Sequence, residues 1–129
     1  MRVLVDTQCW LWMETEPERL SPRARDVLED PANELYLSAA SAWEISIKHA
    51  LGKLRLPLPP ARYIPSRMRR SGVRPQPVEL EHALRAGGLP MHHRDPFDRM
   101  IVAQAQLERL AVLTADPWFQ AYRVPVVPA

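Results

Sequence analysis

Short apolar runs without polar alternation recur along the chain and predict buried strands. Val3–Val5, Leu35–Leu37 and Ala111–Leu113 are such runs, and uninterrupted apolar strands are typical of parallel sheets that are covered on both faces. Two further segments contain strand-forming residues together with prolines. The prolines favour an edge strand or extended loop at Val73–Val78 and an edge strand at Val124–Val127.

Helical patterns separate these strands. One helix begins at Ser38, and its apolar stripe runs from Ala40 through Trp43 and Ile47 to Leu54, with Gly52 near its end. The other expected helices are Thr7–Met13, Ser21–Glu29, Ala61–Arg70 with an interruption at Pro65, Glu79–Ala86, Pro96–Leu110 and a brief one from Asp116. Strands that alternate with helices predict a three-layer α/β/α domain with a central parallel sheet.

Length and composition agree with one domain covering residues 1–129. The chain is 47% hydrophobic and 25% charged, and no apolar run approaches the ~20 residues needed to span a bilayer. The first residues, MRVLVDTQ, lack the apolar core of a secretory signal, so we expect a cytoplasmic protein that does not bind membranes. Cys9 is the single cysteine, and we expect it to be a core residue on the first helix.

Several acids lie where the predicted strands and helices meet. Asp6 directly follows the first strand, and Asp116 follows Ala111–Leu113 by three residues. Both are expected at one edge of the sheet, because both follow the carboxyl ends of parallel strands. Ligands in such sheets bind beyond these ends. Glu44 and Asp98 are expected at the borders of buried helix faces that reach the same edge. Carboxylates gathered there would repel one another by roughly several kcal/mol unless a divalent cation lay among them.

Carboxylates without suitably spaced Cys or His favour Mg²⁺ or Mn²⁺ over zinc. A pair of such ions can activate water and stabilise the leaving oxygen at phosphorus, which suggests metal-dependent phosphodiester hydrolysis. His92 and His93 are alternative metal ligands, but we expect them to orient Asp95 or its loop instead.

The acids also have ordinary structural explanations. Asp95 followed by proline, with Asp98 in the first turn, is a common helix start, and Asp116 is also followed by proline. Glu44 precedes Lys48 by four residues, the spacing of a helical ion pair worth ~0.3 to 0.5 kcal/mol. Only the convergence of the acids at one edge favours a functional site.

The basic residues suggest a partner with phosphate groups. Fifteen of the seventeen are arginine, although the net charge is only +2; arginine suits bidentate phosphate contacts, but the same bias can reflect genome composition. The residues considered for an RNA-binding surface are Lys48, Lys53, Arg55, Arg62, Arg67, Arg69, Arg70, Arg94 and Arg99. Tyr63 and Trp118 could stack on unpaired bases, although core packing or a dimer contact is favoured. His49 and His82 are expected on helix surfaces.

Four ordered motifs resemble the PIN-domain toxins of the VapC type. They are LVDTQCWLW, LSPRARDVLEDPANELYLSAASAWEISIKHALGKL, HRDPFDRMIVAQA and LTADPWF. The resemblance implies a parallel sheet between helices and a ribonuclease site with Mg²⁺ or Mn²⁺. It implies catalytic roles for the acids at positions 6, 44, 98 and 116, with metal contacts from Asp6, Asp98 and Asp116. Asp95 would act first as a helix cap and then as support for the metal site, and Thr114 would brace the site.

The resemblance also implies a biological setting. Such toxins cut RNA and arrest growth, form homodimers, and are silenced by a cognate antitoxin whose tail lies across the active cleft. One departure is Gln8, where relatives often carry histidine. Because the carboxylates are intact, this change concerns substrate fit rather than catalysis.

The same residues support two other classes of function less well. A metal-binding phospho-acceptor or signalling α/β domain needs an acid pair after the first strand and a lysine near the end of the last strand. Here Asp6 stands alone, and no lysine follows Lys53. A PIN-like binding module without catalysis would be expected to have lost acids, whereas all four are present. The sequence therefore favours a metal-dependent endoribonuclease.

Overall fold

The computed structural model describes residues 1–129 and contains one sheet of five parallel strands in the order β3-β2-β1-β4-β5. The strands are β1 (Arg2–Val5), β2 (Glu34–Ser38), β3 (Val73–Gln76), β4 (Ala111–Thr114) and β5 (Val126–Pro128). The predicted central parallel sheet is confirmed. The two proline-containing segments form its edges, where a missing backbone N–H costs no ladder hydrogen bond.

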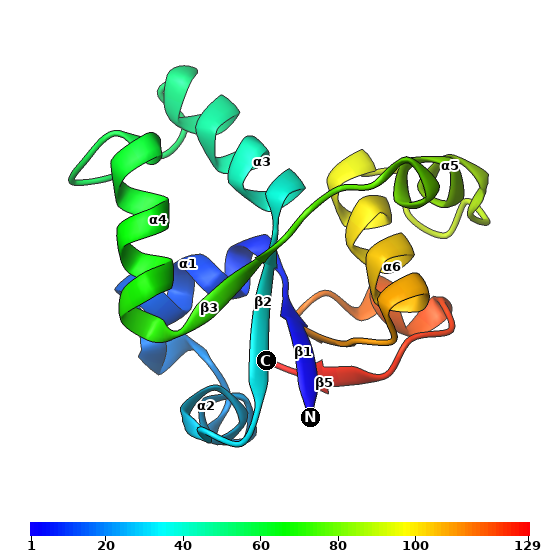
Figure 1. The fold of residues 1–129 in the computed structure, drawn as a ribbon, viewed down its shortest axis with the longest axis horizontal. Coiled ribbons are helices and arrows are strands. Elements are labelled where there is room, and N and C mark those ends of the chain that lie inside the picture. The colour runs from blue at the N-terminus through cyan, green and yellow to red at the C-terminus, as the bar shows by residue number, and fades with distance from the viewer.

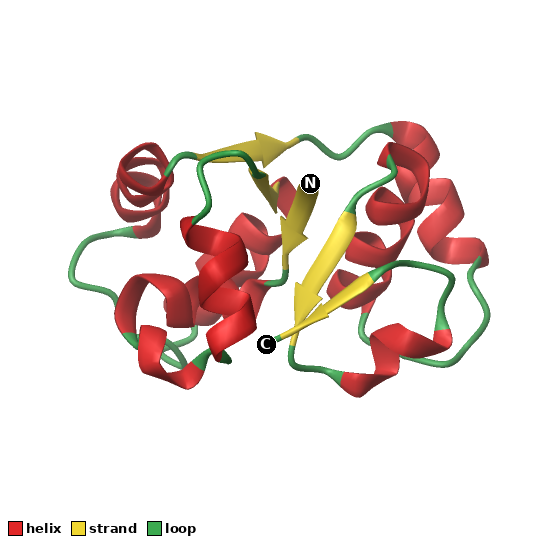
Figure 2. Ribbon diagram, turned by 90° about the horizontal axis from the view of Figure 1, so that it is seen from below, coloured by secondary structure: helices red, strands yellow, loops and turns green.

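Helices cover both faces of the sheet. They are α1 (Thr7–Thr15), α2 (Pro22–Glu29), α3 (Ala39–Ala50), α4 (Pro60–Ser71), α5 (Leu80–Gly88) and α6 (Pro96–Glu108), with short 3-10 helices η1 (Pro17–Arg19) and η2 (Pro117–Ala121). Helices α1 to α4 lie on one side of the sheet and α5 and α6 on the other (Figure 1), so that the strands run between two helical layers (Figure 2). None of the helices has the length and apolar character required to cross a membrane.

The central strand explains why its sequence shows no polar alternation. Val3 and Val5 belong to the core cluster formed with α1 to α4, whereas Leu4 belongs to the cluster formed with α6. All three side chains are fully buried. Successive residues of a strand point to opposite faces, and both faces of β1 are covered, so every position has to be apolar.

Helix α3 packs on a face that coincides only in part with the predicted stripe. Trp43 and Leu51 are each 64% exposed, whereas Ala40, Glu44 and Ile45 are buried. The packed side includes Ser41, whose hydroxyl accepts a 2.9 Å hydrogen bond from Thr7 at the start of α1. The predicted stripe was therefore wrong for Trp43 and Leu51, because small and polar side chains fill this contact, whereas Ala40 and Leu54 do pack against the protein. Glu44 therefore points inward instead of lying at a border.

His82 was predicted on a helix surface, and the structure shows it fully buried. Its Nδ1 accepts a 2.9 Å hydrogen bond from the backbone N–H of Glu79, which caps α5. Its Nε2 lies 2.9 Å from Glu108 at the end of α6. The histidine thus joins two helices that pack together, a pairing that its own helix pattern did not reveal.

The sheet order marks the boundary between β1 and β4 as the expected place for a ligand. Chain connections from β1 lead to β2 and β3 on one side, and the connection through α5 and α6 then crosses to β4 on the other side. The strand order therefore reverses between β1 and β4. In open parallel sheets, ligands bind outside the carboxyl ends of the strands at such a reversal.

Helix α4 continues through Pro65, where an interruption was expected. Tyr63, Ile64 and Met68 bury one face of this helix in the core, while Ala61 and Pro65 are exposed. Burial of that face offsets the loss of one helical hydrogen bond at the proline.

Replacement of Pro65 by alanine should therefore raise the free energy of unfolding by roughly 1 to 3 kcal/mol, because it restores the missing donor. Urea denaturation at constant m-value measures the change. The matched control is Pro60→Ala, at the first position of α4, where proline is favourable and its loss should not stabilise. Equal or lower stability of the Pro65 variant would contradict this account of α4.

Candidate active site

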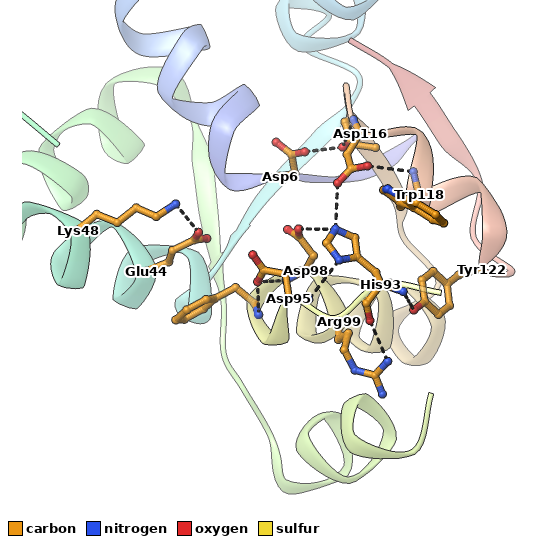
Figure 3. Close-up of polar contacts among 12 residues, drawn as sticks. Asp6, Glu44, Lys48, His93, Asp95, Asp98, Arg99, Asp116, Trp118 and Tyr122 are labelled. Carbon is orange, nitrogen blue, oxygen red and sulfur yellow. Dashed lines mark hydrogen bonds and ion pairs between the residues drawn. The ribbon is translucent and has the colours of Figure 1, made fainter. Parts of the chain in front are cut away.

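Acidic side chains from four segments converge at the carboxyl edge of β1 and β4 (Figure 3). Asp6 follows β1, Glu44 lies on α3, Asp98 lies in the first turn of α6, and Asp116 follows β4. The structure therefore brings together the four acids that the sequence analysis selected. A cavity of about 420 Å³ beside them is lined by residues including Asp6, Gln8, Glu44, Lys48, Lys53, Asp95 and Asp98.

Asp6 is held on both of its oxygens. It is the N-cap of α1, and its Oδ1 accepts a 2.8 Å hydrogen bond from the backbone N–H of Cys9. Its Oδ2 accepts a hydrogen bond from the hydroxyl of Thr114. The same hydroxyl oxygen accepts a 3.0 Å hydrogen bond from the N–H of Asp116. Burial raises the pKa of Asp6 above its usual value, although these hydrogen bonds oppose the shift.

Asp95 and Asp98 divide two tasks at the start of α6. Asp95 is the N-cap, and its Oδ1 accepts hydrogen bonds from the N–H groups of Phe97 at 2.8 Å and Asp98 at 3.3 Å. Asp98 has no backbone partner and points toward Asp116 and His93 (Figure 3). The side chain of Asp98 is therefore not used in capping and faces the site, and Asp95 fixes the helix end that carries it.

The surroundings of Asp98 strongly favour its protonated form. Burial, followed by the negative charge of Asp95, raises the pKa of Asp98 to about 7. His93 opposes this shift, while Asp6 and Glu44 add to it. A carboxyl group that is difficult to ionise for these reasons gains most when a cation enters the site.

Glu44 is 7% exposed and forms the predicted ion pair with Lys48, at 2.8 Å between Oε2 and Nζ. This hydrogen bond is the main reason why the pKa of Lys48 is raised. The negative charges of Asp95 and Asp98 also contribute to that shift. Lys48 thus faces the acid cluster as a whole and partly neutralises it.

His93 contributes more to the site than the sequence indicated. Its Nε2 lies 3.0 Å from Oδ2 of Asp98 and 3.0 Å from Oδ2 of Asp116. Its Nδ1 accepts a 3.1 Å hydrogen bond from the N–H of Asp95, which agrees with the expectation that it orients this residue. Proximity to Asp95 was visible in the sequence, but the contact with Asp116 depends on the fold.

Asp116 completes the group and also caps η2. Its Oδ1 accepts a 2.9 Å hydrogen bond from the N–H of Trp118, while its Oδ2 faces His93. The structural explanations for Asp95 and Asp116 are therefore correct, since both are helix caps, and Asp6 is a helix cap as well. Capping uses one oxygen of each, while the second oxygen of Asp6 accepts from Thr114 and the second oxygen of Asp116 faces His93.

Several residues expected near RNA lie elsewhere. Arg99 is buried, and its guanidinium donates to backbone carbonyls of Leu89, Pro90 and His93, so it holds a loop and is not part of a basic surface. Tyr63 is buried in the core, as was favoured over a contact with bases, whereas Trp118 is 57% exposed.

The arginines at positions 67, 69 and 70, at the end of α4, lie near the amino ends of the strands, whereas the acids lie near the carboxyl ends. Only Gly72 separates α4 from β3. The last turn of α4 therefore lies at the amino end of that parallel strand, away from the acids. Lys48 and Lys53 are the basic residues that line the acidic cavity.

The donor set fits a hard divalent cation. Asp98, Asp116 and His93 each offer one atom, and these atoms lie within 4.8 Å of one another. Asp6 lies near the same place, since the charge of Asp116 contributes to the raised pKa of Asp6 and the charge of Asp6 contributes to the raised pKa of Asp98. Carboxylate oxygens suit Mg²⁺ or Mn²⁺. The carboxylates that could hold such an ion are Asp6, Asp98 and Asp116, with Glu44 nearby.

The raised pKa of Asp98 gives the metal-free protein a defined pH dependence. The folded protein retains this proton up to about pH 7, whereas the usual aspartate value is 3.8. The free energy of unfolding should therefore fall as pH rises between these values. Asp98→Asn should remove this fall and stabilise the metal-free protein above pH 7 by roughly 1 to 3 kcal/mol.

Urea denaturation in a chelator, at pH 4 and at pH 8, measures the effect. The two proteins should be similar at the lower pH, where Asp98 is protonated. Asp26→Asn, which changes an exposed acid on α2, should show no such gain. Lower stability of the Asp98 variant at pH 8 would mean that the carboxylate itself supports the fold.

Comparisons with known proteins agree with this geometry. The chain is 50% identical over 68 residues to ribonuclease VapC16 of Mycobacterium tuberculosis, covering 51% of this chain and 48% of that protein. It is 29% identical over 126 residues to ribonuclease VapC22 of the same organism, covering 95% and 93%. The crystal structure of VapBC2 from Rickettsia felis bound to a promoter DNA fragment contains a chain with the same fold, with a TM-score of 0.72, 11% identity, and coverage of 100% and 99%. A family model for the PIN domain matches residues 3–125, and the chain therefore belongs to the PIN domain family.

Proposed function

We propose that this chain is a Mg²⁺- or Mn²⁺-dependent endoribonuclease and the toxin of a type II toxin–antitoxin pair. The observation that carries the proposal is the convergence of Asp6, Asp98 and Asp116 beside Glu44 at the carboxyl ends of β1 and β4. Ribonuclease names among its PIN-domain relatives support the reaction. The VapBC complex among the structures with this fold supports a cognate antitoxin as partner. We also propose a homodimer, as the family resemblance implies.

The residues of the site would perform distinct tasks during hydrolysis. A bound divalent ion would supply a polarised water and neutralise charge on the phosphate. Asp6, fixed by Thr114 and the start of α1, provides a carboxylate oxygen that cannot swing away. Asp98 and Asp116 would provide further oxygens from the first turn of α6 and from the end of β4. Such fixed ligands lower the reorganisation that accompanies the reaction.

The lysines beside the acids would contact the RNA backbone. Lys48 lies against Glu44, and Lys53 is exposed at the same cavity and has no ion-pair partner. Their charge offsets the acids, which would otherwise repel phosphate. A phospho-acceptor domain is not favoured, because the chain belongs to a nuclease family and both lysines at the cavity come from the α3 region.

Asp6→Asn and Asp98→Asn should each reduce RNA cleavage by about 100-fold or more, because each removes a charged ligand of the ion. Cleavage of a labelled RNA pool is followed with Mg²⁺, with Mn²⁺ and with chelator. Wild-type cleavage should disappear with chelator and return with either ion. Asp26→Asn, the same substitution on α2, should cleave at the wild-type rate. Cleavage by folded Asp98→Asn protein at that rate would refute the proposed site.

Lys53→Ala should lower the salt dependence of RNA binding by about 0.7 in the slope of log K against log salt, the value for one phosphate contact to a single strand. Fluorescence anisotropy with an RNA oligonucleotide measures the slope, with Asp98→Asn in all proteins to prevent cleavage. Arg69→Ala, near the amino ends of the strands, is the matched control and should leave the slope unchanged. A larger change for Arg69 than for Lys53 would move the interface to α4.

A further inference from the structure

The loop before α6 is fixed from two sides, and this fixes His93. Arg99 donates hydrogen bonds to the carbonyls of Leu89 at 2.9 Å, Pro90 at 3.1 Å and His93 at 3.2 Å. The hydroxyl of Tyr122 donates to the carbonyl of Pro90 at 2.9 Å and accepts from the N–H of His93 at 2.9 Å. A buried arginine and a buried tyrosine thus hold the backbone of one histidine, whose ring reaches the acids (Figure 3).

The hydrogen bonds of the ring determine which nitrogen carries the proton. Nδ1 lies 3.1 Å from the N–H of Asp95, so it acts as an acceptor and bears no hydrogen. A neutral imidazole with an unprotonated Nδ1 carries its hydrogen on Nε2. That N–H points at two carboxylate oxygens, one from Asp98 and one from Asp116, each 3.0 Å away.

The two carboxylates come from different parts of the fold. Asp98 lies in the first turn of α6, and Asp116 follows β4 and caps η2. No hydrogen bond joins these aspartates directly, since both are acceptors when ionised. The His93 N–H is the group that contacts both and offsets their repulsion.

We propose that His93 is a positioning residue that uses its Nε2–H to hold Asp98 and Asp116 at the spacing that a divalent ion requires, without being a ligand itself. This inference rests on the proposed function, because it concerns the same metal site. Ligation through Nε2 would require the hydrogen to move to Nδ1, where it would face the N–H of Asp95. Groups that donate hydrogen bonds to ligating carboxylates commonly affect metal affinity by about 10- to 100-fold.

Two substitutions separate the two nitrogens of the ring. Asparagine at position 93 places an amide near the position of Nδ1, where its oxygen can accept from Asp95, but it is too short to reach the aspartates. Glutamine can place its NH₂ group near the position of Nε2 and donate to both aspartates, but it loses the acceptor for Asp95. His93→Asn therefore preserves the contact with the loop, and His93→Gln preserves the link between the carboxylates.

Mn²⁺ binding, measured by electron paramagnetic resonance of the free ion, is the first readout. His93→Asn should weaken Mn²⁺ binding by about 10- to 100-fold, and His93→Gln should stay within about threefold of the wild type. His92→Asn is the control, because His92 is exposed and contacts the ring of Tyr122, with centroids 5.2 Å apart; it should bind as the wild type does. Pulsed measurements on the bound ion should show no directly coordinated nitrogen.

Each other result overturns the inference. Weak binding by His93→Gln with normal binding by His93→Asn would mean that the histidine serves only the loop. Weak Mn²⁺ binding by both variants would indicate a role specific to imidazole, such as ligation. Normal Mn²⁺ binding by both variants would exclude any role of His93 in metal binding. If the wild type binds Mn²⁺ and cleaves RNA in these cases, the proposed function stands. If the wild type neither binds Mn²⁺ nor cleaves RNA, both proposals fail.

Discussion

The pairing of β1 with β4 is the interaction on which the site depends. The register joins Val5 to Leu113, and the N–H of Asp6 continues it with a 3.0 Å hydrogen bond to the carbonyl of Leu113. This pairing brings the hydroxyl of Thr114 to the carboxylate of Asp6. A shift by one residue would turn these side chains to the other face of the sheet. The buried apolar residues of both strands oppose such a shift, so core packing fixes the distance between the acids.

The starts of three helices also stabilise the acidic side chains of the site. Asp6, Asp95 and Asp116 each cap a helix that starts at this edge of the sheet. Backbone N–H groups at helix starts favour negative charge, which partly offsets the repulsion among the acids and the cost of their burial. Lys48 and His93 offset more of it from two other directions. The remaining imbalance is visible in the raised pKa of Asp98 and makes the site receptive to a cation.

Much of the fold could be predicted because its elements are encoded locally. The apolar runs of β1, β2 and β4 were predicted correctly, since a strand buried on both faces needs apolar residues at every position. The Ser21–Pro22 start of α2 and the Asp95–Pro96 start of α6 were correct for a similar reason, because caps act within one turn. The predictions for Trp43, His82 and Arg99 were wrong, because the burial of each side chain depends on segments distant in sequence.

The sequence by itself determined the alternation of strands and helices, the helix caps, and which acids follow the strand ends. Those features depend on residues within a few positions of one another. Only the tertiary structure decided that Glu44 faces inward, that Arg67, Arg69 and Arg70 lie away from the acids, and that His93 contacts both Asp98 and Asp116. The reason is physical: burial and the repulsion between charges depend on distances through space, and these exist only after the sheet has brought separate segments together.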